Sequence, residues 1–428
     1  MLKGFYRVAL LGLSSIASTF GYASAADTYG IGARSVSLGN AAVTGSTDAY
    51  QAFSNPAALT DSDRPLLSFD FTVTDLRLND LSGLAQNSPS GLPTDAYRAS
   101  RANDLRGSSL GINLPLFEGV HFGLAGYMPN GNFGRIWGAT SDDSTYLRYS
   151  DRQQRPAIYT ALAARLGAGW SIGAGAYYTL KARGILQMAL AQEASAARFQ
   201  LEMEPILIPY GGIQWAGEKF KFGLVYRAEQ AETSMIDTDL AINFDSASLP
   251  FSLQSTLAPF YDPEMFRFGG AYEGDTIRLY TSAEFSRWSG YLAPQLALSG
   301  ADIGLVSQGS ARPSLNLNDT WAYRGGIEFR AGRFADFENL WRLGFEHHSS
   351  ATGSRSPQSI VDLTRNVIAL GYGLQVLEGV LADDRAARFE IAYQRTLLQD
   401  QTYRPENAAS VTAGGTMHTL VGGFQYEL

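Results

Sequence analysis

The chain has 428 residues, of which 45% are hydrophobic, 12% aromatic and only 17% charged, with 45 Gly and no Cys. This charged fraction lies well below the roughly 25% that is usual in soluble domains. The absence of Cys excludes a disulfide scaffold and thiolate chemistry. The formal net charge of −8 argues against a nucleic-acid partner.

Residues 1–25 have the composition of an export signal. Lys3 and Arg7 give a positive start, an apolar run follows over 8–20, and Ala23-Ser24-Ala25 matches the small-x-small pattern of a cleavage site. The alternative, a short membrane anchor, requires roughly 20 apolar residues, and Ser and Thr interrupt this run too early. We therefore expect a signal peptide over 1–25, followed by either a soluble periplasmic protein or a β-barrel.

Apolar and polar residues alternate in many segments of the chain. In residues 219–227, Phe220, Phe222, Leu224 and Tyr226 fall on one face of a strand, and the residues between them fall on the other. Residues 276–288, 340–347 and 387–394 repeat this pattern. A soluble β-sandwich would show the same period, so the lengths of the connections have to decide between the two classes.

Fourteen strands can be assigned from this alternation. Short connections between them take turns with long ones, and both the even number and this turn pattern are typical of bacterial outer-membrane barrels. The strand-like segment 234–244 would make fifteen, and we assign it to a long external connection. The sequence thus predicts an all-β fold, a transmembrane antiparallel β-barrel of about 14 strands in the outer membrane of a Gram-negative cell. The predicted strands are 66–78, 105–115, 119–129, 156–166, 170–182, 201–214, 219–229, 264–273, 276–288, 319–330, 339–349, 365–376, 386–398 and 414–428.

Five of the six Trp fall near predicted strand ends, where rings with a polar tip prefer the two membrane interfaces. The chain also finishes on an amphipathic strand, which suits a closing barrel. Packing of Trp beneath loops is the alternative that any β-protein allows. The five are Trp170, Trp215, Trp288, Trp321 and Trp341.

Residues 26–64 do not alternate and are rich in small side chains. Pro56 fixes its own φ and favours an extended Asn55, whose side chain can bond nearby backbone groups in a turn. With these residues the sequence resembles the FadL family of outer-membrane long-chain fatty acid and hydrocarbon transporters. The resemblance depends on Gly32, Ser35, Leu38, Gly39, Ala41, Ala42, Asp48, Ala49 and the tripeptide Asn55, Pro56 and Ala57, and more weakly on the strand count and on Phe285-Ser286-Arg287-Trp288.

The resemblance implies a monomeric barrel over 65–428, with 26–64 folded back as a hatch that plugs the lumen. It also implies capture of a long-chain fatty acid or other hydrophobic compound in an external groove, and transfer to an apolar pocket near the mature N-terminus. Exit would be sideways into the membrane beside a kinked third strand. Outer-membrane lipids and the barrel assembly machinery are the other partners expected, with no cofactor and no metal. The mature start lacks the family's Phe, and Leu428 stands where the family ends on Phe.

Two predicted external loops, 183–200 and 246–262, are unexpectedly apolar. Such side chains on exposed loops mark a binding surface or pack against one another, and a groove between the two loops would satisfy both interpretations. The predicted substrate-binding residues are Leu186, Leu190, Leu249, Phe251, Leu257 and Phe260.

The predicted third strand contains Gly123 and Gly126 and ends at Pro129. Gly and Pro weaken or interrupt a strand ladder, so these three residues are the candidates for the sideways opening. Gly is common throughout the chain, which is the structural alternative.

Alternation also points charged side chains into the lumen. A cation there could hold a fatty carboxylate, but mutual ion pairs around the hatch are the interpretation we favour. The predicted inward charges are Lys219, Lys221, Arg227, Arg278, Arg324, Arg330, Glu284, Glu328, Glu346 and Glu390.

Enzymatic motifs are missing from the sequence, so we do not expect an enzyme. It has four His and no phosphate-binding Gly loop, His-Glu-x-x-His or Gly-x-Ser-x-Gly. An outer-membrane lipase with distant Ser and His remains a formal alternative, as does a general polar pore. A FadL-like barrel that serves as a scaffold or secretion-system partner without transport is the main alternative, because fold does not fix function.

Overall fold

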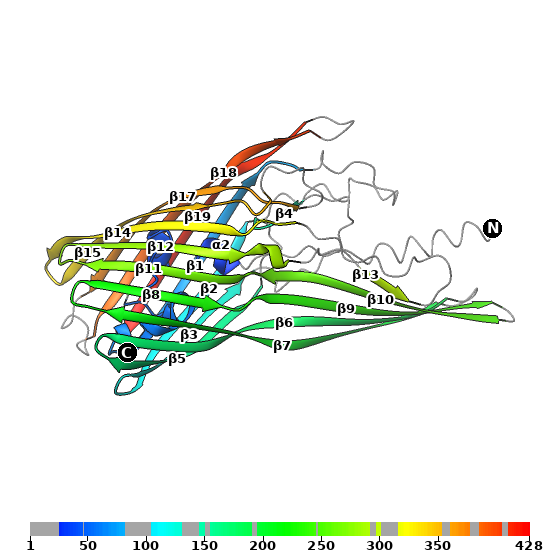
Figure 1. Cartoon of the computed structure of the whole chain (residues 1–428), viewed down its shortest axis with the longest axis horizontal. Coiled ribbons are helices and arrows are strands. Elements are labelled where there is room, and N and C mark those ends of the chain that lie inside the picture. Colours follow the sequence, from blue (N-terminus) through cyan, green and yellow to red (C-terminus); the bar gives the residue numbers. More distant parts are fainter. Residues whose placement is uncertain are drawn as a thin grey trace.

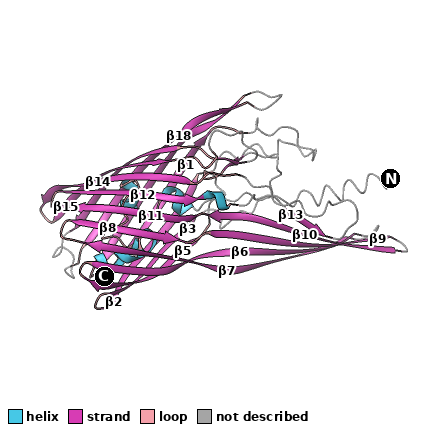
Figure 2. Ribbon diagram, viewed as in Figure 1, coloured by secondary structure: helices cyan, strands magenta, loops and turns pink. Residues whose placement is uncertain are grey.

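The computed structural model describes residues 25–45, 47–81, 104–130, 145–149, 155–190, 195–244, 247–291, 297–300, 316–352, 360–376, 385–404 and 410–428, with only the backbone for parts of 179–203 and 232–260. Within these ranges, fourteen long strands form one closed antiparallel barrel (Figures 1 and 2). Closure is complete because β1 pairs with both β2 and β19. The barrel strands are β1 (Leu66–Leu78), β2 (Leu105–Phe117), β3 (Val120–Pro129), β5 (Ala157–Gly167), β6 (Trp170–Leu190), β7 (Ser195–Ala216), β8 (Phe220–Arg227), β11 (Glu264–Glu273), β12 (Ile277–Arg287), β14 (Thr320–Phe334), β15 (Phe337–His348), β17 (Arg365–Val376), β18 (Ala387–Tyr403) and β19 (Val411–Glu427).

The predicted strand count and fold class are confirmed. The segment assigned to an external connection forms β9 (Gln230–Phe244), which pairs with β10 (Ala247–Asp262) outside the barrel, while β8 pairs directly with β11. Short turns lie at one end, which faces the periplasm in barrels of this kind. The long connections lie at the other, external end, at the right of Figure 1. These are the features of an outer-membrane β-barrel.

Side chains alternate between lipid and lumen as the sequence predicts. On β8, Phe220 and Phe222 are exposed on the outer face, whereas Val225 and Arg227 are buried in the lumen. Trp170 and Trp321 are also exposed at strand ends, and Trp341 is exposed four residues inside β15. The prediction was wrong for Trp288, which is only 2% exposed because it follows β12 into the external side of the barrel and packs there.

The two apolar segments predicted as loops are strands instead. Residues 183–190 and 195–200 extend β6 and β7 to 21 and 22 residues, about twice what is needed to cross a bilayer, and 247–262 form β10. Beyond the membrane β6 pairs in parallel with β9, and β13 (Ala297–Gly300) pairs with β10. The external part of the molecule is thus a sheet in which the β6–β7 hairpin pairs with the β9–β10 hairpin.

Short helices of the N-terminal segment lie inside the barrel (Figure 1). They contact the inner faces of strands on opposite sides of the lumen, from β3 to β7 and from β15 to β19. In the part of the chain described, no helix is both long and apolar enough to span a membrane. The helices are α2 (Ala25–Tyr29), α3 (Ala33–Ser37), α4 (Gln51–Ser54) and the 3-10 helix η1 (Pro56–Asp61).

Candidate functional site: the filled lumen

The tripeptide Asn55, Pro56 and Ala57 connects α4 to η1 in the way the sequence predicts. Asn55 is extended (φ −160°, ψ 109°), and its Oδ1 accepts a hydrogen bond from the backbone N–H of Ala57 at 3.0 Å. The Asn55 side chain lies against Gly212 of β7, where an added Cβ would approach Asn55 Oδ1 to 2.1 Å. Because Gly212 has no Cβ, the barrel wall leaves room for the Asn55 side chain in this turn.

Polar contacts fix the helical segment to the wall around it. Asn113 of β2 donates to the Leu59 carbonyl at 2.8 Å, and Gln214 of β7 donates to Asp61 Oδ1 at 2.7 Å. Burial raises the pKa of Asp61, and the neighbouring Lys221, whose Nζ lies 3.3 Å from Asp61 Oδ1, opposes this effect. The segment is thus bound to the barrel through buried polar groups.

One wall of the lumen, from β11 to β18, carries alternating charges. Glu328 of β14 accepts from Arg34 of α3 at 3.1 Å and from Arg342 of β15 at 2.7 Å, and Arg278 lies 3.2 Å away. A second chain of ion pairs runs from Arg267 through Glu284, Arg324 and Glu346 to Arg365. The hatch is thereby joined to the barrel through buried charge.

Buried cations are neutralised throughout the lumen. Each of the nine buried arginines in the described ranges has a carboxylate partner, so none remains for the head group of a fatty acid. The prediction of mutual ion pairs around the hatch is confirmed with two exceptions among the described residues: Lys219 lies exposed in a turn, and Arg330 lines the polar cavity at the periplasmic end without an ion pair. The nine are Arg34, Arg148, Arg155, Arg227, Arg267, Arg324, Arg342, Arg365 and Arg388.

The opposite wall, from β2 to β7, carries an apolar and aromatic cluster around α2. Tyr159 stacks on Tyr177 with ring centroids 4.5 Å apart, and it meets Phe53 of α4 edge-on at 5.0 Å. Tyr29 of α2 is buried within the same group of residues. We call this set the inner apolar cluster; it includes Tyr29, Ile31, Tyr50, Leu59, Tyr127, Tyr159, Tyr177 and Tyr210.

Two connections cover this cluster from the external side. β4 (Thr145–Tyr146) and β16 (Ile360–Val361) pair in parallel, and the residues that follow them are buried. Arg148 binds Asp362 at 2.8 Å and lies over the Trp288 ring at 5.2 Å, which accounts for the burial of Trp288. We call residues 145–149 and 360–363 the outer cover. The sequence carried no signal for it, because its two halves are 214 residues apart at this ion pair.

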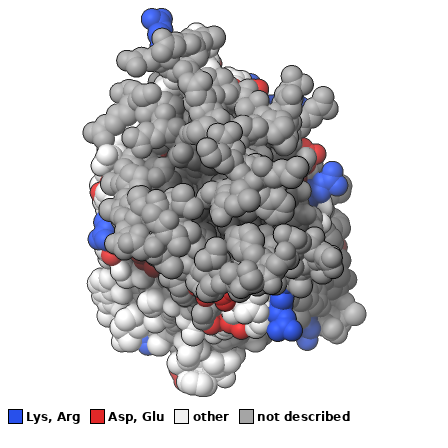
Figure 3. All heavy atoms as spheres, turned by 90° about the vertical axis from the view of Figure 1, so that its right-hand side faces the viewer, with Lys and Arg blue, Asp and Glu red and all other residues white. Residues whose placement is uncertain are grey.

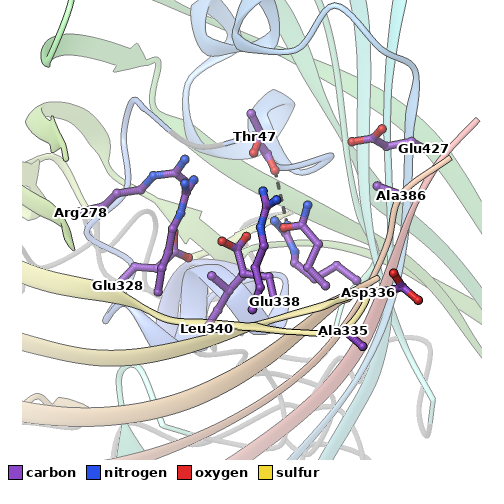
Figure 4. A pocket seen from close by; sticks show the side chains of 13 residues that line it. Thr47, Arg278, Glu328, Ala335, Asp336, Glu338, Leu340, Ala386 and Glu427 are labelled. Atoms are coloured by element: carbon purple, nitrogen blue, oxygen red, sulfur yellow. Dashed lines mark hydrogen bonds and ion pairs between the residues drawn. The ribbon is translucent and has the colours of Figure 1, made fainter. Parts of the chain in front are cut away.

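A polar cavity of about 690 Å³ opens at the periplasmic end, between Thr47 and the turn that joins β14 to β15 (Figure 4). Its lining includes Arg330, Arg333, Asp336 and Glu338. A hydrophobic molecule would find charged groups rather than apolar surface on this side, so the cavity does not extend the inner apolar cluster.

The six predicted substrate-binding residues lie in β6 and β10, and their register brings them together. Each is aligned with an even-numbered residue of β9, and aligned residues share a face of a sheet. A register shift between Leu257 and Phe260 keeps both on that face. All six positions, Leu186, Leu190, Leu249, Phe251, Leu257 and Phe260, therefore occupy one face of the external sheet. On the opposite face, Gln187, Arg198 and Asp239 are exposed.

The candidate residues for a sideways opening lie in a strand that is paired on both sides. β3 is aligned with β5 without interruption from Val120 to Tyr127, and with β2 as far as Pro129. Gly123 faces the lumen, where an added Cβ would approach Leu59 of η1 to 2.4 Å. Gly126 has open space around it on the lipid side, with nothing closer than 3.9 Å to an added Cβ.

Comparison with known proteins gives the same class of barrel. No protein-family profile matches the chain, and no curated protein matches its sequence. Solved structures share its fold. A FadL homologue of Pseudomonas aeruginosa aligns over 96% of this chain and 99% of its own, with a TM-score of 0.58 at 14% identity. The toluene transporter TodX of P. putida aligns over 94% and 99% (TM-score 0.56, 13% identity).

The toluene transporter TbuX of Ralstonia pickettii is also similar, over 94% of this chain and 99% of its own, with a TM-score of 0.54 at 10% identity. At such low identities the similarity establishes the fold. The chain has the fold of the FadL-type outer-membrane barrels, as its N-terminal motif led us to expect.

Proposed function

We propose that this protein lets long-chain fatty acids or similar hydrophobic compounds cross the outer membrane by passive diffusion, and that they leave sideways beside β3. The observation that carries the proposal is the inner apolar cluster, which residues of the N-terminal helices and of the barrel wall form beneath the outer cover. Aromatic hydrocarbons belong to the proposed substrates, because two barrels of the same fold are toluene transporters.

The two walls of the lumen support a hydrophobic rather than an ionic path. On the wall from β11 to β18 the charged groups are paired with one another, and the hatch joins them through the ion pair between Arg34 and Glu328. The inner apolar cluster instead offers aromatic rings to a hydrophobic molecule, which would have to displace the outer cover to enter from outside.

Mass spectrometry of small molecules extracted from the purified barrel is the direct test of this function. A retained fatty acid or hydrocarbon is the expected result, together with poor ion conductance in planar bilayers. A stoichiometric protein partner with no retained small molecule would favour the scaffold, and steady high conductance would favour a polar pore.

Truncation of the external sheet should impair capture of the substrate. We expect Phe251→Ala combined with Phe260→Ala to lower the uptake of a hydrophobic substrate by roughly tenfold, since each substitution removes apolar surface from the same face of the sheet. The amount of assembled barrel, read from its heat-dependent mobility, should not change. Ser252→Ala with Gln254→Ala changes the opposite face and is the matched control. Unchanged uptake in the Phe variant would reject the external binding surface.

Crosslinks across β3 test the sideways exit. The chain has no Cys, so the pairs Leu110→Cys with Gly126→Cys, and Gly126→Cys with Ile158→Cys, can be introduced at aligned positions. The Cα atoms of aligned residues on antiparallel strands lie about 4.5–5.5 Å apart, a separation that a disulfide can bridge. Oxidation of the pair that spans the exit should reduce uptake to background, and reduction should restore it.

The control for these crosslinks joins β14 to β15 on the far side of the barrel, through Gly325→Cys with Phe345→Cys. This disulfide should leave uptake at the wild-type level. Full uptake with both β3 crosslinks formed would show that the substrate leaves by another route.

A further inference from the structure

The lipid-facing surface of the strands from β15 to β2 changes from apolar to polar at one height along the barrel axis. On β18, Phe389, Ile391 and Tyr393 are exposed to lipid, and Arg395 is the next outward residue. On the neighbouring strands, the outward-facing residues also change from apolar to polar after four or five positions, counted from the periplasmic end. The polar residues that end the apolar run toward the external side are His347 on β15, Asn366 on β17, Arg395 on β18, His418 on β19, Asp75 on β1 and Ser108 on β2.

Three of these polar positions are directly aligned across strands. Arg395 is aligned with His418, and His418 with Asp75, which places their Cβ atoms about 4.5–5.5 Å apart. Arg77 lies one outward position above Asp75, binds it at 2.7 Å and is well exposed. Tyr393 and His418 are joined at 2.7 Å between the hydroxyl and Nδ1. Two arginines and a histidine therefore surround one patch of the lipid-facing surface.

The level of Arg395 corresponds to the outer membrane interface. An arginine on the lipid face costs about 2–4 kcal/mol at the bilayer midplane and about 0–1 near the interface, so Arg395 marks the outer edge of the membrane. Within the described ranges, Arg395 has no carboxylate in contact with it, and Asp75 is already paired with Arg77. The patch carries an excess of positive charge directly above exposed apolar side chains.

A comparable arginine on the far side of the barrel is neutralised by the protein itself. Arg287 ends β12 at the external rim and is half exposed, and its Nη1 lies 2.9 Å from Glu264. Viewed from the external end, charged side chains of described residues lie around this rim (Figure 3). Arg287 therefore has a carboxylate partner within the protein, whereas no such partner contacts Arg395 among the described residues.

We propose that Arg395, His418 and Arg77 bind a phosphate group of a glycolipid in the outer leaflet. The side chains arise from the lipid-facing surface, with Tyr393, Ile391 and Leu420 directly below them. A bound molecule must therefore combine an anionic head at the interface with acyl chains along the barrel. Arg395 and Arg77 donate charge-assisted hydrogen bonds to the phosphate oxygens, and this binding is separate from the path of a transported substrate.

Native mass spectrometry of the full-length barrel, with diphosphorylated lipid A added in detergent, tests the proposal. We expect Arg395→Gln to weaken lipid binding by about tenfold, Arg395→Lys to retain part of it, and Arg287→Gln to leave it unchanged. Lipid A without phosphates should bind the wild type at least as weakly as diphosphorylated lipid binds Arg395→Gln, and excess inorganic phosphate should not displace the lipid. Equal binding by wild type and Arg395→Gln, or equal binding of the two lipids, would overturn the proposal.

Discussion

Glu328→Gln is expected to lower the free energy of unfolding by about 3–5 kcal/mol and to raise the ion conductance of the barrel. Glu328 is 1% exposed and lies between the guanidinium groups of Arg34, Arg342 and Arg278. Without its charge, three cations remain close together in a buried site, and Arg34 no longer holds α3 against β14. Denaturant unfolding of the reconstituted barrel and planar-bilayer recordings measure the two effects.

Glu427→Gln is the matched control for this experiment. Glu427 also joins the N-terminal segment to the barrel, through Arg64 at 2.8 Å, but Arg64 is half exposed to solvent. A surface pair of this kind contributes about 0–1 kcal/mol, so stability and conductance should remain close to those of the wild type. Equal losses in the two variants would show that burial does not govern the strength of these contacts.

Gly344→Val should displace the hatch from its wall. An added Cβ at Gly344 of β15 would lie 2.1 Å from the backbone N of Gly39 and 2.3 Å from the carbonyl carbon of Leu38. Backbone atoms cannot turn aside as a side chain can, so we expect a loss of about 1–3 kcal/mol in stability from overpacking. Accumulation of a small polar dye by cells should rise well above the wild-type level.

The control is Gly422→Val on β19, where an added Cβ meets no atom within 4 Å because the position faces lipid. It introduces the same side chain into a strand of the same barrel without touching the hatch. Dye entry should therefore match the wild type. If Gly344→Val also leaves dye entry unchanged, close packing of residues 38 and 39 against β15 is not what seals the lumen.

Much of the fold could be predicted because its signals are local. The alternation of side chains over 276–288 located β12 (Ile277–Arg287) to within a residue at each end. Short turns and long connections then gave the fourteen strands and the orientation of the barrel. The turn at Asn55 and Pro56 was predicted for the same reason, since the restricted φ of Pro and the short reach of Asn act within three residues.

The candidate site was predicted only in part. The apolar residues of the two external segments were recognised, but their loops proved to be strands, and a groove between loops became one face of a sheet. The outer cover was missed, since Arg148 and Asp362 meet only after the barrel has closed. Trp288 was assigned to the membrane interface, although Arg148 covers its ring.

Which residues face lipid and which face the lumen can be read from the amino-acid sequence, because a period of two places successive side chains on opposite faces of any strand. The closed barrel fold, in contrast, decided which inward charges pair with one another, as Glu328 does with Arg34 from the hatch. It also decided that the wall of β2 to β7 is aromatic inside while the other wall is ion-paired. These contacts join residues up to several hundred positions apart, and their geometry is set by strand register and barrel closure, which no local pattern records.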